Sequence, residues 1–326
     1  YFQPIEIAKI GFILVFAKYL EKNSGNINTL KDKIQENDLE FNLFFTRKLR
    51  SGNYVSFSPN IDAQIYDDLL NLICDYIGQF TGKTIVNYNP TGYKDETIES
   101  CSTSYIRDYI RVLESFNNSD HVKTEIDPDN YSFYTFSITK HDDQFPDIKI
   151  FRRVTKFKKL HSKGIIARFN GNTLNKIESK LIGIDGEVDF IIIDDDILIL
   201  SHYSLERVFN LDEQFRDTAS DFLNQEGLSD GITNFESFYE DCLNDGRYRK
   251  TLTKMTSENI NVAKTYENHE NIKKTIDMFN LEINYNEEPS FSIVYEDKSQ
   301  IMDILRILRD SYYRSIINEQ IGVDDK

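Results

Sequence analysis

The first half of the chain alternates between a hydrophobic pattern typical of strands and one typical of helices. Runs of β-branched and aromatic residues, bounded by turn residues, predict strands at 41–46, 54–57 and 84–88. Apolar residues three and four positions apart predict a helix at 61–73 behind the capping residue Asn60. They predict a second helix that begins at Ser102 or Ser104 and ends at 117–120. The apolar run within 5–20 falls short of the about 20 residues of a membrane span, so it predicts a core-facing helix instead of a signal peptide.

The clearest strand pattern lies between residues 131 and 200. The segments 131–138 and 148–154 each predict one strand, and 180–200 predicts three more, joined by turns at Asp185-Gly186 and Asp194-Asp195. The segments 191–193 and 197–200 are apolar on both faces. This hairpin is therefore expected in the middle of a covered sheet and not at its edge.

After Ser204 the hydrophobic period changes to that of helices. Short helices are expected around 205–209, 215–223 and 235–243, followed by a long polar helix over 258–279. A strand at 291–295 and a last helix capped by Ser299 complete the pattern, and the tail from Gly322 is expected to fray. The chain is therefore predicted to be α+β, with a central, mostly antiparallel sheet, N-terminal helices and a helical C-terminal third.

The length of 326 residues allows about two domains. The pattern divides the chain into an N-terminal mixed α/β region at 4–130, a central antiparallel sheet with a basic strip at 131–203, and a helical C-terminal region at 204–318. The alternative is that the helical region and the sheet form one continuous domain.

The overall charge, taken alone, argues against a nucleic-acid partner. The chain has 38 basic and 54 acidic residues, and a formal net charge of −16. The charges are unevenly distributed, however. Segment 151–183 has nine basic residues and one acidic residue, whereas 184–246 has two basic residues and seventeen acidic ones. The total therefore conceals a strongly basic segment next to a strongly acidic one.

The basic segment predicts a phosphate-binding strip, because Lys and Arg release counterions when they neutralise nucleic-acid phosphates. The predicted DNA contacts are Arg152, Arg153, Lys156, Lys158, Lys159, Lys163 and Arg168, with Arg247, Arg249 and Lys250 as a second contact where a helix begins. The alternative is a solvated surface that pairs with the acidic helices of the chain itself.

The acidic segment contains a carboxylate cluster whose oxygen atoms suit magnesium or calcium. Its members are Asp185, Glu187, Asp189, Asp194, Asp195 and Asp196. Asp is also favoured at hairpin turns for local backbone reasons, and the spacing matches no EF-hand loop. We therefore expect no bound metal and no cofactor. The three cysteines (Cys74, Cys101 and Cys242) are not spaced as a thiolate zinc site or a disulfide framework.

Two further hypotheses come from other functional classes. In a metal-dependent nuclease, Asp147 and Glu178 would hold the metal while Lys180 helped to activate water. In an interaction module, the acidic helices around Asp212, Glu213 and Asp217 would dock a basic partner. The chain contains none of the common catalytic signatures, such as a P-loop or an HExxH motif, so we expect no catalytic residues.

Three stretches resemble a known family. The segment 184–200, which continues into 203–210, resembles the centre of the KwaB family, the soluble component of the bacterial Kiwa anti-phage defence system. Residues 44–48 and 298–312 resemble the same family. The resemblance implies a double-stranded-DNA-binding effector that acts with KwaA, a multi-span membrane protein. It also implies a homo-oligomer, dimer or higher, and a cytoplasmic location, peripherally at the inner membrane through this partner. It supplies no catalytic residues.

Overall fold

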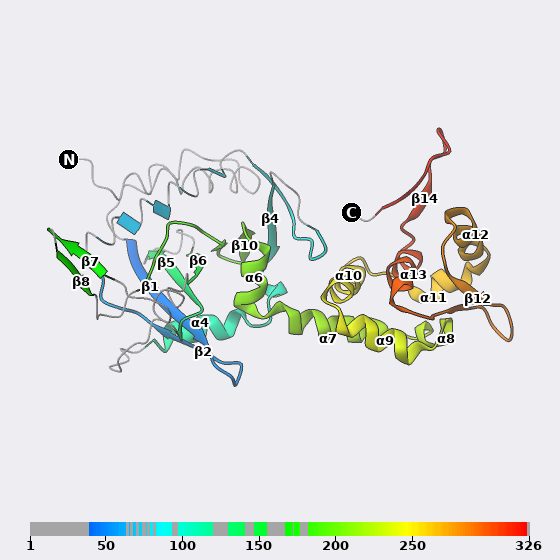
Figure 1. Cartoon of the computed structure of the whole chain (residues 1–326), viewed down its shortest axis with the longest axis horizontal. Coiled ribbons are helices and arrows are strands. Elements are labelled where there is room, and N and C mark those ends of the chain that lie inside the picture. The colour runs from blue at the N-terminus through cyan, green and yellow to red at the C-terminus, as the bar shows by residue number, and fades with distance from the viewer. Residues whose placement is uncertain are drawn as a thin grey trace. The chain divides into compact units, whose positions relative to one another are not determined.

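The computed structural model describes most of the chain (Figure 1). The described residues are 39–62, 65, 68–69, 72–73, 76, 79–80, 83–92, 97–119, 130–140, 147–154, 167–171, 173–176 and 182–324. The helix predicted within 5–20 lies outside them, as do Lys156, Lys158, Lys159, Lys163, Glu178 and Lys180. The chain divides into two compact units, and each is considered by itself. Unit 1 comprises residues 1–88 and 95–209, and unit 2 comprises residues 89–94 and 210–326.

Unit 1 is built on an eight-stranded sheet with the order β2-β1-β5-β6-β9-β10-β4-β3. The strands are β1 Leu39–Lys48, β2 Tyr54–Phe57, β3 Thr84–Asn87, β4 Thr97–Ser102, β5 Phe133–Lys140, β6 Ile148–Arg153, β9 Phe190–Ile193 and β10 Asp196–Ile199. All neighbours are antiparallel except β3 and β4, which run parallel. The predicted strands at 41–46, 54–57, 84–88, 131–138 and 148–154 are confirmed. The β9–β10 hairpin lies inside the sheet, as its apolar pattern predicts.

The two faces of this sheet carry different side chains, because successive strand residues point in opposite directions. One face is aromatic. Phe151 and Phe190 stack there with ring centroids 4.5 Å apart, and Phe209 of helix α6 (His202–Phe209) contacts both rings. Helix α4 (Tyr109–Asn117) covers the same face through Phe116. The opposite face is mainly aliphatic and packs against Leu69 and Ile73, which confirms a helical segment within 61–73.

Two expectations for unit 1 are wrong. The strand predicted at the start of 180–200 is reduced to an isolated bridge at Gly183 within the described residues. The helix predicted from Ser102 or Ser104 begins only at Tyr109. Ser102 instead caps a single 3₁₀ turn, Thr103–Tyr105, and Ile106 returns to an extended conformation before α4. A separate hairpin of β7 (Ala167–Asn170) and β8 (Thr173–Lys176) completes the described elements of this unit.

Unit 2 is mainly helical, as predicted. Its helices are α7 Leu211–Leu223, α8 Leu228–Gly231, α9 Phe235–Asn244, α10 Gly246–Ser257, α11 Val262–Glu267, α12 His269–Phe279 and α13 Ile301–Leu308. A small sheet joins β11 (Ile232–Thr233), β13 (Ser292–Val294) and β12 (Asn284–Asn286), and β14 (Tyr312–Arg314) pairs with β15 (Ile321–Val323). The α+β prediction for the whole chain is therefore confirmed.

Three details of unit 2 correct the sequence analysis. The predicted helix over 258–279 is two helices, α11 and α12, which meet at Asn268. The last helix is preceded by a 3₁₀ turn whose capping box pairs Asp297 with Gln300, so Asp297 and not Ser299 is the cap. The tail does not fray at Gly322, because that residue lies in β15 opposite Tyr313.

Candidate nucleic-acid interface

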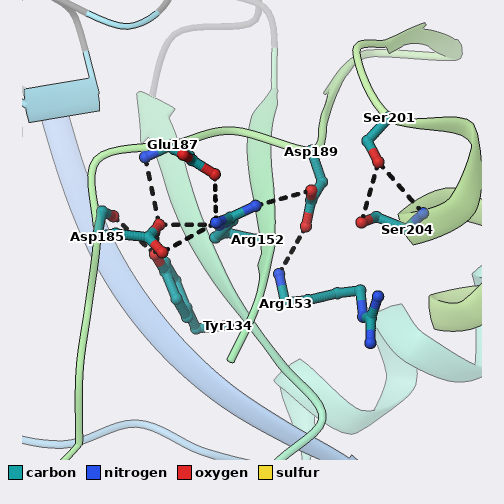
Figure 2. A network of polar contacts seen from close by, with 8 residues as sticks. All are labelled: Tyr134, Arg152, Arg153, Asp185, Glu187, Asp189, Ser201 and Ser204. Atoms are coloured by element: carbon teal, nitrogen blue, oxygen red, sulfur yellow. Dashed lines mark hydrogen bonds and ion pairs between the residues drawn. The ribbon is translucent and has the colours of Figure 1, made fainter. Parts of the chain in front are cut away.

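Arg152 and Arg153, the first two residues of the predicted phosphate strip, end strand β6 and face opposite sides of the sheet. Arg152 lies on the side of Ile150, whereas Arg153 lies on the aromatic side with Phe151. Figure 2 shows the consequence: carboxylates surround Arg152, and the guanidinium of Arg153 points away from them. The two neighbouring arginines therefore have different environments.

Arg152 is held by three carboxylates of its own chain. Its Nε and Nη2 donate to the two oxygens of Asp185 at 2.8 and 2.9 Å, and its Nη1 donates to Asp189 Oδ1 at 3.1 Å. Nη2 also contacts Glu187. Burial opposes the charged form, but the hydrogen bond to Asp185 and the charges of Asp189, Asp185 and Glu187 raise the pKa of Arg152 above its ordinary value. Within the chain, the guanidinium of Arg152 holds the 185–189 loop.

Asp189 connects this network to the start of helix α6. Its side chain is buried, and Oδ2 accepts a 2.7 Å hydrogen bond from the backbone N–H of Arg153. Its backbone carbonyl accepts from the N–H groups of Leu200 and Ser201, at 3.0 and 2.8 Å. Ser201 in turn bonds to Ser204 in the first turn of α6 (Figure 2). The loop thereby fixes the end of β6 against the beginning of α6.

This arrangement brings Arg153 to an exposed tyrosine on α6. The guanidinium carbon of Arg153 lies 4.8 Å from the ring centroid of Tyr203, and that of Arg207 lies 5.2 Å from the same ring. Tyr203 is 55% exposed. In the part of the chain that the structure describes, neither guanidinium makes a hydrogen bond or an ion pair. We call these three residues the Arg153–Tyr203–Arg207 cluster.

Further positive charge lies beside the end of α6. Lys48 and Arg111 both bond to the single carboxylate of Asp108, at 2.8 and 3.0 Å. Tyr54 Oη lies 3.1 Å from the same carboxylate and 3.0 Å from the carbonyl oxygen of Val208, the residue after Arg207. Two cations on one carboxylate leave an excess positive charge at this place.

The sequence analysis identified Arg153 but missed Tyr203 and Arg207. These two are four residues apart on α6, the spacing at which helical side chains meet. A Tyr–Arg pair at that spacing could therefore have predicted that these two side chains lie together on one face of a helix. Its closeness to Arg153 depends on the Asp189 contacts, which sequence spacing does not reveal. Arg168 lies on β7.

The predicted second contact is divided between two environments. Arg247 is exposed and pairs with Asp245, the cap of α10. Arg249 is mostly buried: its Nη1 donates to the carbonyl of Leu243 at 2.7 Å and its Nη2 to Asp212, which ties α10 to α9 and α7. Lys250 lines a groove beside α13. Of the three, Arg249 therefore uses its guanidinium group for contacts between helices of its own chain.

The acidic cluster of the sequence is split between the two ends of β9. Asp185, Glu187 and Asp189 surround Arg152, whereas Asp194 follows the strand, roughly 16 Å further along at the rise of a β-strand. Asp194 accepts a 3.0 Å hydrogen bond from the N–H of Asp147, whose own carboxylate pairs with Lys149. Across the described residues, no three His, Cys, Asp or Glu side chains are grouped so as to hold a metal ion.

These features define an α+β protein with a covered eight-stranded sheet and a basic, aromatic surface cluster where the sheet meets α6. The family model described as "Kiwa protein KwaB-like" matches residues 128–318, which is more than half of the chain. The chain therefore belongs to the KwaB-like family, as the resemblance predicted, and is a component of the Kiwa anti-phage defence system. No curated protein and no solved structure matches it. None of the helices described in the structure is long and apolar enough to cross a membrane.

Proposed function

We propose that this Kiwa component binds double-stranded DNA largely through the phosphate backbone. The observation that carries the proposal is the Arg153–Tyr203–Arg207 cluster, in which two guanidinium groups share one exposed ring. Two like charges brought together without a carboxylate repel each other, and a bound phosphate relieves this repulsion. Arg is suited to the task because its planar fork binds phosphate oxygens in pairs while its face stacks on an aromatic ring.

The proposal extends along the chain from the end of β6. Lys156, Lys158, Lys159, Lys163 and Arg168 follow Arg153 in the basic segment and belong to the same proposed interface. Phosphate contacts position a protein on DNA without reading its sequence, so binding is expected to depend weakly on base sequence. The proposal includes a KwaA-like membrane protein as partner, a homo-oligomeric state, and a cytoplasmic position at the inner membrane through that partner.

A binding titration with a 30-base-pair duplex over a series of salt concentrations tests the proposal. The substitutions Arg153→Glu and Arg207→Glu together should weaken binding roughly tenfold or more and reduce the slope of log affinity against log salt by about two. The matched control is Lys264→Glu with Lys274→Glu, which makes the same change in net charge at two exposed residues of unit 2. This control should retain both the affinity and the slope.

Two results would overturn the proposal at different levels. If the arginine variant binds like the control, the cluster is not the interface. If the unmodified protein fails to bind the duplex even at low salt, DNA binding itself is wrong, and the interaction-module hypothesis takes its place. Charge reversal around Asp212, Glu213 and Asp217 should then disrupt assembly with the membrane partner.

A further inference from the structure

The turn between strands β1 and β2 of unit 1 holds an arginine at its tip. The N–H of Leu49 donates to the carbonyl of Asn53 at 2.7 Å, and the N–H of Gly52 donates to the carbonyl of Leu49 at 3.0 Å. Gly52 has a φ of +86°, the left-handed conformation that closes a three-residue hairpin loop. These two hydrogen bonds place Arg50 and Ser51 at the outermost point of a tight turn.

The turn projects from the sheet and does not pack against it. β2 is an edge strand, and in Figure 1 the blue turn extends beyond the ends of β1 and β2. A Cβ atom added to Gly52 would meet no atom within 4 Å outside the adjoining residues. Arg50 is exposed, and so is Leu49, to 36%. A cation and a large apolar side chain are therefore presented together to solvent.

Arg50 differs from the other cations beside this turn. In the part of the chain that the structure describes, its guanidinium makes no hydrogen bond and no ion pair. Lys48 and Arg111, in contrast, already bond to Asp108. Glu114 lines a pocket together with Arg111, and its charge opposes a phosphate at that place. A further contact with an anionic partner is therefore assigned to Arg50 and not to the paired cations.

The register of the sheet places this turn at the same end as the Arg153–Tyr203–Arg207 cluster. Arg153 of β6 pairs with Phe133 of β5, which pairs with Thr46 of β1. Thr46 is thus about 10 Å from Arg153 across the sheet, and Arg50 lies four residues further on, at about 3.3 Å per residue. The resulting separation of about 16 Å between Arg153 and Arg50 is about half of a helical turn of B-DNA. One duplex is therefore long enough to contact both arginines.

The chemistry of the tip matches the minor groove of DNA. A helix or a whole two-stranded ribbon requires the major groove, about 12 Å wide, whereas the minor groove of about 6 Å admits a single long side chain. Arg is drawn into narrow A·T minor grooves by their strong negative potential, and minor-groove proteins often add an apolar side chain such as that of Leu49. A G·C pair places the amino group of guanine in this groove, whereas an A·T pair presents only acceptors. A donor such as Arg50 should therefore favour A·T pairs.

We propose that the β1–β2 turn inserts Arg50 into the minor groove, next to the DNA backbone that the Arg153–Tyr203–Arg207 cluster contacts. This insertion presupposes the DNA binding proposed above. It adds a small preference for A·T pairs to phosphate contacts that read no sequence.

Binding titrations with three 30-base-pair duplexes test the insertion. Their central tracts consist of A·T pairs, G·C pairs, or I·C pairs in which inosine replaces guanine. An I·C pair lacks the minor-groove amino group but keeps the major-groove pattern of G·C. The unmodified protein should bind the A·T and I·C duplexes about fivefold more tightly than the G·C duplex.

Arg50→Ala should weaken binding to the A·T and I·C duplexes by about tenfold and should remove the preference over G·C. Arg216→Ala is the matched control, because it removes an exposed arginine from α7 in unit 2. This control should keep both the affinities and the preference.

If Arg50→Ala binds all three duplexes like Arg216→Ala, the turn does not contact DNA. If the I·C duplex binds as weakly as the G·C duplex, the assignment to the minor groove is wrong, because reading of the major groove gives that order. In both cases the Arg153 and Arg207 substitutions would still weaken binding if the proposed function is correct. A lack of binding to any duplex at low salt would overturn the proposed function, and the insertion of Arg50 with it.

Discussion

Arg152 and Arg153 illustrate how adjacent residues of one charge type can have unrelated roles. Strand geometry alone predicts that their side chains face opposite sides of the sheet. The sequence does not reveal that the 185–189 loop folds back over β6, because this depends on Tyr134 donating to the carbonyl of Asp185 and on Asp189 bonding to the Arg153 backbone. A count of charges in 151–183 therefore identifies the segment, but not which arginine faces solvent.

Replacement of Arg152 by Ala should destabilise unit 1 by about 3 kcal/mol, because it leaves the buried carboxylate of Asp189 without its cation. Urea denaturation followed by circular dichroism measures the loss. Arg153→Ala removes the same side chain from the next position and should change the free energy of unfolding by less than about 0.5 kcal/mol, as is usual at a surface. Equal losses for the two variants would contradict the role assigned to Arg152.

Individual elements were predictable where the hydrophobic pattern was strong. β5, β6, β9 and β10 are rich in apolar residues, and the sequence predicts each of them. β4 was missed because its residues after Ile98 are mostly polar: Glu99, Ser100, Cys101 and Ser102. Glu99 is buried and faces His202 Nε2, so the polar strand is accommodated by a partner about one hundred residues away in the sequence.

The contact between α8 and α11 gives a prediction at this scale. A Cβ atom added to Gly231 would overlap the ring of Tyr266, well inside van der Waals distance. Gly→Ala in a helix ordinarily stabilises a protein, but here overpacking should reverse the sign and cost about 1–3 kcal/mol. Thermal or urea denaturation measures this loss. In a Tyr266→Ala background the same change should be close to neutral, and a penalty that persists there would show that the ring is not its cause.

At the scale of the whole molecule, the net charge of −16 is the sum of a strongly basic segment, a strongly acidic segment and the rest of the chain. Acidic residues at 185–189 neutralise Arg152, and Asp212 neutralises Arg249. Part of the acidic excess therefore forms ion pairs with arginines of the same chain. The two arginines of the Arg153–Tyr203–Arg207 cluster, by contrast, have no carboxylate partner among the described residues. The sequence predicted a local basic surface within an acidic chain, but the location of its parts depends on tertiary pairing.

The two units also have separate hydrophobic cores. In unit 1 an aliphatic cluster covers one face of the sheet and an aromatic cluster covers the other, whereas the core of unit 2 is formed by its helices and small sheet. Phe151 and Phe238 are each 0% exposed, and each contacts a second aromatic ring of its own unit, Phe190 at 4.5 Å and Tyr295 at 5.3 Å. They form a matched pair for asking whether the cores unfold independently.

Calorimetry should show two unfolding transitions. Phe151→Ala should lower only the transition of unit 1, and Phe238→Ala only that of unit 2. Each substitution should cost about 3–5 kcal/mol, because it leaves a cavity in a buried aromatic cluster. For units of this size the loss corresponds to a decrease of roughly 10 °C or more in the midpoint. A single transition that both substitutions lower equally would instead mean that the two cores unfold as one, so that a mutation in unit 2 would also weaken the DNA interface proposed in unit 1.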